Sequence, residues 1–228
     1  MLSTLVLAAL AAMPGRLGSA TLPVAPVSAH ADAFEKLMAR WALVTDYVVT
    51  IDTLETKGAV SSRSMVRYSF RKPDRARLEV IDGNNRGGVV VWQGGAEATA
   101  YKRGIFSIAK IHADLSDKRI QSLRGNGVLT PDLTVALACF AAHRSDVHTE
   151  PGPVIAGERT ETVELRYARF SCPMDSPIDA DITRDVLRVS ERTGAVIRRE
   201  RYEGQSLVES YDLKDLMVNP GLGDDDFK

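Results

Sequence analysis

The sequence lacks the features that usually announce an enzyme or a nucleic-acid-binding protein. No Gly-x-Ser-x-Gly, phosphate-loop or Gly-x-Gly-x-x-Gly motif occurs in its 228 residues, so neither a serine nucleophile nor a nucleotide site is indicated. Lysine and arginine number 29 against 30 aspartate and glutamate, which gives no basis for a nucleic-acid partner. We therefore expect no catalytic residues, no cofactor and no nucleic acid as a partner.

Cysteine is scarce as well, since Cys139 and Cys172 are the only two. Cys139 stands four residues before His143, but no convincing set of further ligands accompanies this pair, so we predict no metal site. In an oxidising compartment the two cysteines can form a disulfide, and two buried thiols are the alternative.

The uncharged apolar run from Leu2 to Met13 is too short to span a bilayer and has the length of a signal-peptide hydrophobic region. Small residues follow at Gly18-Ser19-Ala20 and at Ala29-His30-Ala31. We predict that residues 1–20 are a signal peptide, with cleavage as late as residue 31 as the alternative, and that residues 32–228 form a single domain. The mature protein is expected to be soluble and periplasmic, with no transmembrane segment.

What the sequence does contain is alternation. The stretch from Met65 to Arg103 has four short runs of alternating apolar and polar residues, separated by turn residues, which is typical of an antiparallel meander of half-buried strands. The run Val89 to Trp92 is apolar throughout and should be covered on both faces. A polar face is predicted for the arginines that alternate with the apolar residues: Arg67, Arg71, Arg75 and Arg77. Further strands are predicted at 47–52, 161–169, 185–190, 196–202 and 207–216.

Two amphipathic helices should cover the apolar face of this sheet. Residues 32–46 carry apolar side chains at intervals of three and four. Residues 130–143 form the second helix, with Thr130 as its expected cap and Leu133, Leu137 and Phe140 as its stripe. The segment 104–126 shows neither period and is expected to be a loop with short helical turns, and the acidic run 224–226 is expected to be a solvated tail.

Two stretches carry a resemblance to a known family. The first is FRKPDRARLE from Phe70 to Glu79, followed by Val91-Trp92-Gln93-Gly94. The second lies near the C-terminus and includes ESYDLKDLMVNPGL from Glu209 to Leu222. Both resemble stretches of LolA-like periplasmic lipoprotein carriers and related outer-membrane lipoprotein-sorting-like proteins. The resemblance implies a mainly β fold with helices (α+β): an incomplete antiparallel β-barrel of about eleven strands with a helical lid and a cavity for acyl chains.

The predicted ligand cavity combines the apolar strand face with the second helix. Its residues are Val66, Tyr68, Phe70, Leu78, Val80, Trp92, Tyr101, Leu133, Leu137 and Phe140. In LolA an arginine before the turn proline latches the lid, and in this sequence that position is Lys72. Lysine is a point charge without the planar fork of arginine, so the resemblance carries a latch over to Lys72 only as a hypothesis.

Two functions follow as hypotheses. The first is an exported, non-enzymatic carrier or sensor that holds a lipid acyl chain or a lipoprotein in the half-barrel, with envelope membrane proteins as further candidate partners. The alternative is a cell-envelope interaction or regulatory module whose barrel is filled by its own helices and binds no lipid. Its working surface would be the arginine-rich strand face.

Overall fold

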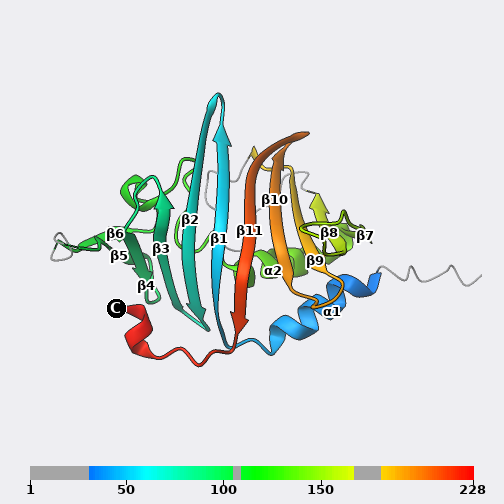
Figure 1. The fold of residues 1–228 in the computed structure, drawn as a ribbon, viewed down its shortest axis with the longest axis horizontal. Helices are drawn as coiled ribbons and strands as arrows, with labels where there is room; N and C mark the ends of the chain where they lie inside the picture. Colours follow the sequence, from blue (N-terminus) through cyan, green and yellow to red (C-terminus); the bar gives the residue numbers. More distant parts are fainter. Residues whose placement is uncertain (1–30, 105–108, 167–180) are drawn as a thin grey trace, which may run out of the picture.

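A computed structural model describes residues 31–104, 109–166 and 181–228, which form one antiparallel sheet of eleven strands (Figure 1). The strand order is β6-β5-β4-β3-β2-β1-β11-β10-β9-β8-β7, so the two ends of the domain meet at the centre, where β1 pairs with β11. Within the described residues β6 and β7 are the open edges, and the predicted incomplete antiparallel barrel is confirmed. The strands are β1 (Asp46–Lys57), β2 (Val60–Arg71), β3 (Arg75–Gly83), β4 (Gly88–Trp92), β5 (Glu97–Lys102), β6 (Ile111–Asp114), β7 (Val147–Pro151), β8 (Thr160–Arg166), β9 (Arg184–Ser190), β10 (Val196–Glu203) and β11 (Ser206–Val218).

The central strands follow the predicted alternation. In β2, Val66, Tyr68 and Phe70 are all buried, whereas Arg67 between them is exposed. Tyr47 of β1 lies opposite Phe70 in the register, and the two rings are 5.7 Å apart. Because side chains alternate between the faces of a strand, this row defines the inner face of the sheet.

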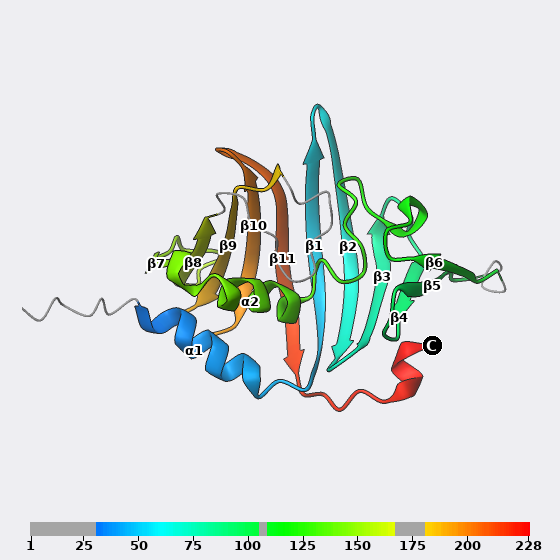
Figure 2. The same cartoon turned by 180° about the vertical axis from the view of Figure 1, so that it is seen from behind.

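Two helices, α1 (Ala31–Ala42) and α2 (Leu133–Ala142), pack on that inner face over β7 to β11 and β1 (Figure 2). Helix α1 contributes Phe34, Leu37 and Trp41 to the main core. Helix α2 contributes its predicted stripe, Leu133, Leu137 and Phe140, all of which are buried. Full burial of such a side chain stabilises the fold by roughly 1.5–3 kcal/mol.

The cap of α2 was predicted wrongly. Thr130 lies in a preceding turn, where its backbone N donates to the carbonyl of Gly127. The cap is Asp132, whose Oδ1 accepts from the backbone N of Thr134 at 2.7 Å. The carboxylate of Asp132, directly after Pro131, accepts from a free backbone N–H of the first helical turn. Threonine is also a common N-cap residue, but Thr130 lies too far before the helix to fill this role.

Strands β6 and β7 were not predicted. The segment 104–126, expected to be a loop with short helical turns, contains such a turn in the short helix η1 (Lys118–Ile120), but it also contains β6. The sequence of β7, VHTEP, does not alternate and ends in a proline that only an edge strand tolerates.

The C-terminus is anchored instead of solvated. The helix η4 (Asp224–Phe227) places Phe227, 1% exposed, against Val89 and Val91 on the outer face of β4. This contact supplies the second cover predicted for that apolar strand. The acidic run 224–226 is exposed, as expected, and the anchor is Phe227, which that expectation did not cover. The predicted signal peptide lies outside the described residues.

Candidate functional site

A cavity of about 620 Å³ lies between the inner face of β1 to β5 and the segment 109–131 that leads from β6 to α2. In Figure 2, α1 and α2 lie over the β7 to β11 half of the sheet, and the segment 109–131 passes in front of β2 and β3. Ligand sites for small molecules are of this size, roughly 300–1,000 Å³. The helices therefore fill one half of the barrel and leave space in the other.

One part of the cavity wall is apolar. Leu78 and Val80 of β3 and Val90 of β4 share the inner face with Val66, because Leu78 pairs with both Tyr68 and Val90 in the register. The crossing segment adds Ile120 and Val128 from the other side. Such a surface gains free energy from any apolar group that displaces water, at about 25 cal/mol per Å² buried.

The other part is polar, and it lies toward the hairpin that joins β1 to β2. Toward this hairpin, the residues of β1 that point to the inner face change from apolar side chains to Thr53 and Glu55. Those of β2 change in the same direction from Val66 to Ser64 and Ser62. Strands rise about 3.3 Å per residue, so Ser62, opposite Glu55, is about 13 Å from Val66 along β2. The cavity is thus amphipathic along its length.

A buried hydrogen-bonded network supports this polar end. Glu55 of β1 and Glu209 of β11 lie directly opposite each other, and Nδ2 of Asn126 donates to both carboxylates, at 2.8 and 3.0 Å. The same nitrogen lies 3.1 Å from the hydroxyl of Tyr211, which donates to Glu209 Oε2 at 2.8 Å. Glu55, Asn126 and Tyr211 all line the cavity.

Among the described residues, arginine side chains form ion pairs with Glu209 but not with Glu55. Nε of Arg124 lies 3.1 Å from Glu209 Oε1, and Nη1 of Arg201 lies 2.9 Å from Oε2. Burial alone would raise the pKa of Glu209, but the charge of Arg201 and the donors Asn126 and Tyr211 hold that pKa below its usual value. Burial, reinforced by the charges of Glu209 and Glu55, raises the pKa of Tyr211 well above its usual value, so its hydroxyl keeps its proton.

Sequence reasoning missed this polar end. Glu55 and Glu209 stand at strand positions whose side chains point to the inner face of the sheet. A charged residue among the apolar residues of such a face is the signal that could have revealed them. Asn126 is the last residue of the segment 104–126, which was expected to be a loop. Its contact with β1 and β11 joins residues 71 and 83 positions apart, which no local pattern predicts.

The predicted cavity residues divide into three groups. Val66, Leu78 and Val80 line the cavity. Tyr101 borders it, but its ring packs with the outer cluster around Phe227 and its hydroxyl donates to the carbonyl of Lys228. The remaining residues pack in or against the main core: Tyr68, Phe70, Trp92, Leu133, Leu137 and Phe140. That these six residues contact a ligand remains a prediction, and their packing within the protein does not favour it.

No protein-family model and no curated protein matches the sequence. Among solved structures, an outer membrane lipoprotein-sorting protein domain from Vibrio parahaemolyticus is 13% identical, covers 87% of this chain and 96% of its own, and has a TM-score of 0.44. A LolA superfamily protein from Nitrosomonas europaea is 11% identical, with 87% and 97% covered and a TM-score of 0.40. The chain is similar to both in fold. MucB in the MucA/MucB complex of Pseudomonas aeruginosa is 14% identical, with 86% of this chain and 60% of that chain covered and a TM-score of 0.44.

Lys72, the residue at the latch position, contacts helix α1. Its Nζ donates to the carbonyl of Trp41 at 3.0 Å, in the last turn of the helix. Cations stabilise the C-terminal end of a helix because the carbonyls there lack intrahelical partners. Lys72 therefore ties the turn after β2 to α1, and a role in opening a lid remains a prediction.

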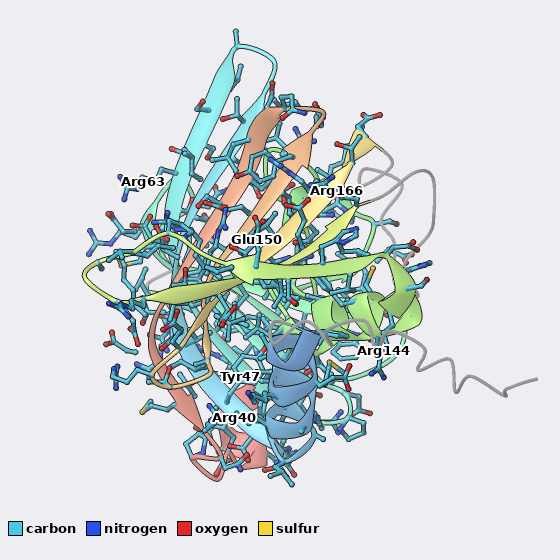
Figure 3. The ribbon with its side chains drawn as sticks, turned by 90° about the vertical axis from the view of Figure 1, so that its right-hand side faces the viewer. Arg40, Tyr47, Arg63, Arg144, Glu150 and Arg166 are labelled. Atoms are coloured by element: carbon cyan, nitrogen blue, oxygen red, sulfur yellow. The ribbon has the colours of Figure 1, made fainter. Side chains whose placement is uncertain are left out.

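The predicted arginine-rich face is largely occupied by contacts within the chain. Arg71 donates to the carbonyl of Leu222 at 3.0 Å and lies over the ring of Phe227. Arg75 donates to the carbonyl of Gln93, and Arg77, mostly buried, pairs with Glu79. Figure 3 shows the side chains on the strands. Of the four predicted arginines, Arg67 is the exposed one.

Three further predictions concern cysteine, metal and membrane. Cys139 forms a disulfide, and its predicted partner Cys172 lies outside the described residues. Within the described ranges, His, Cys, Asp and Glu side chains form no group that could hold a metal ion. The helices among these residues are all too short or too polar to cross a membrane.

Proposed function

We propose that this protein is an exported, non-enzymatic carrier or sensor that holds the acyl chain of a lipid or lipoprotein in the cavity beneath β1 to β5. The observation that carries the proposal is the cavity of about 620 Å³ with an apolar wall, which α1 and α2 leave unfilled. Each methylene transferred from water to such a wall contributes about 0.8 kcal/mol. Chain length should therefore dominate affinity.

The periplasm is the proposed location, with residues 1–20 as a signal peptide and residues 32–228 as the mature domain. An oxidising compartment agrees with the disulfide at Cys139. Envelope membrane proteins are the proposed donors or acceptors of the ligand.

The experiment that tests this function fills the cavity. Leu78 is half-buried and lines the cavity, so the ring in Leu78→Trp would occupy the space of the ligand. Arg67→Trp is the matched control, because it adds the same ring to the exposed face of the neighbouring strand. We expect Leu78→Trp to lose binding of a fluorescent acyl probe by tenfold or more, while Arg67→Trp binds as the wild type does.

Equal binding by both variants would refute the acyl-chain site. If neither the wild type nor the variants bind any acyl probe, the alternative gains support: an interaction module that works without lipid. In that event the exposed Arg67 is the first residue to test in partner binding.

A further inference from the structure

The polar end of the cavity contains a buried carboxylate that no cation among the described residues neutralises. Glu55 is 5% exposed, and within residues 31–104, 109–166 and 181–228 its two oxygens accept from uncharged groups: Oε1 from Asn126 Nδ2 at 2.8 Å and Oε2 from the backbone N of Arg124 at 3.2 Å. The guanidinium of Arg124 turns instead to Glu209, Glu203 and the carbonyl of Thr56. A buried carboxylate without an ion pair interacts strongly with any cation that reaches it.

A second acceptor lies in the same wall. Asn126 is 7% exposed, and its Nδ2 makes three contacts, with Glu55, Glu209 and Tyr211. These contacts fix the orientation of the amide, because only the nitrogen can donate to two carboxylates. The opposite atom, Oδ1, has no hydrogen-bond partner in the described part of the chain. A buried acceptor without a donor is costly, by about 1–3 kcal/mol, unless something supplies the hydrogen bond.

Positive charge at the cavity is weaker than this negative charge. Arg119 lines the cavity, but its guanidinium is engaged in three hydrogen bonds with Asp117, at 2.6, 3.0 and 3.1 Å. Lys102 is exposed, so water screens its charge. The buried Glu55 is screened much less, because the protein surrounds it. The polar end should therefore prefer a donor to an acceptor.

From this arrangement we infer that the ligand is an amphiphile whose head carries an ammonium group, with the head at Glu55 and Asn126 and the chain along Val66, Leu78 and Val80. The inference rests on the proposed function, since it assigns the head of the same ligand. A head-group site gives the cavity a selectivity that an apolar wall alone lacks, because contacts with methylene groups can distinguish ligands only by chain length. An ammonium group has three N–H donors, which is enough to donate to both acceptors, the Glu55 carboxylate and Asn126 Oδ1.

The test compares three probes with the same ten-carbon chain: decylamine, decanol and decanoate, each measured by calorimetry with the full chain. We expect decylamine to bind about tenfold or more tightly than decanol, and decanoate to bind most weakly. Glu55→Gln should reduce decylamine binding to about the level of decanol, and an unchanged circular dichroism spectrum shows that the variant is folded.

Glu203→Gln is the matched control. Glu203 also contacts Arg124 and the substitution removes the same charge, but Glu203 does not line the cavity. The control should keep the amine preference. Equal binding of all three probes, a preference for decanoate, or loss of the preference in both variants would overturn the ammonium assignment and leave the acyl-chain site standing. No binding of any probe would overturn the proposed function itself.

Discussion

Asp132 offers a sharp test of how α2 is held, because it is a buried carboxylate with one unsatisfied oxygen. It is 1% exposed, and its Oδ1 accepts from the hydroxyl of Tyr47 at 2.9 Å and from Thr134 N at 2.7 Å. Its Oδ2 has no hydrogen-bond partner in the described residues. Burial raises the pKa of Asp132 from 3.8 to about 6, against the opposing effect of the hydrogen bonds and of the charge of Lys72.

The raised pKa makes stability depend on pH in a defined direction. Between pH 3.8 and about 6 the folded protein keeps a proton on Asp132 that the unfolded chain has released. The contribution is therefore fully present below pH 3.8 and is lost as the pH rises through about 6. A pKa difference of about two corresponds to a loss of ~3 kcal/mol.

The perturbation is Asp132→Asn, which keeps an acceptor for Tyr47 and Thr134 and cannot ionise. Urea unfolding at pH 4, 5, 6 and 7.5 gives the free energy of unfolding of both proteins. We expect the wild type to lose ~3 kcal/mol relative to the variant across this range. Tyr47→Phe removes one donor to the carboxylate, so the pKa of Asp132 should rise further, and the loss of stability should become larger and extend to higher pH. Parallel pH profiles for the wild type and Asp132→Asn would refute the reasoning.

Three further predictions concern contacts away from Asp132. Phe227→Ala should lower the free energy of unfolding by ~3 kcal/mol or release the C-terminal segment to protease, because the ring is buried against β4; unchanged proteolysis and stability would contradict the anchor. Arg124→Met leaves Glu209 with one cation fewer, so urea unfolding should show a loss of ~3 kcal/mol or more, with Arg119→Met, exposed, as the control. Lys72→Met should cost ~1 kcal/mol and speed amide hydrogen exchange in α1, and unaltered exchange there would argue against the tie to Trp41.

The sequence predicted the parts of the fold that depend on local pattern. The alternation in β2 and the spacing of three and four residues in α2 each mark one apolar face that packs against the core. The residues on these faces are therefore the buried ones. Strand β7 escaped prediction because it is a short edge strand, where few side chains are buried and the pattern carries little information. The cap at Asp132 escaped because several residues near Thr130 can cap a helix, and the fold selects among them.

The cavity could be predicted only in part, for a physical reason. Val66 and Tyr68 share one face of one strand and both belong to the core, but of the two Val66 also lines the cavity. Whether a core residue also borders the cavity depends on where α1 and α2 end on the sheet, and tertiary packing decides that. Glu55 likewise gains its character from Asn126 and Glu209, which are distant in sequence.

Native mass spectrometry of the protein purified from its own cell envelope tests the central claim most directly. The account predicts one bound amphiphile per chain, released on denaturation, and its absence from Leu78→Trp prepared in the same way. Repeated recovery of ligand-free wild-type protein, with the cavity occupied by its own side chains in an experimental structure, would contradict it.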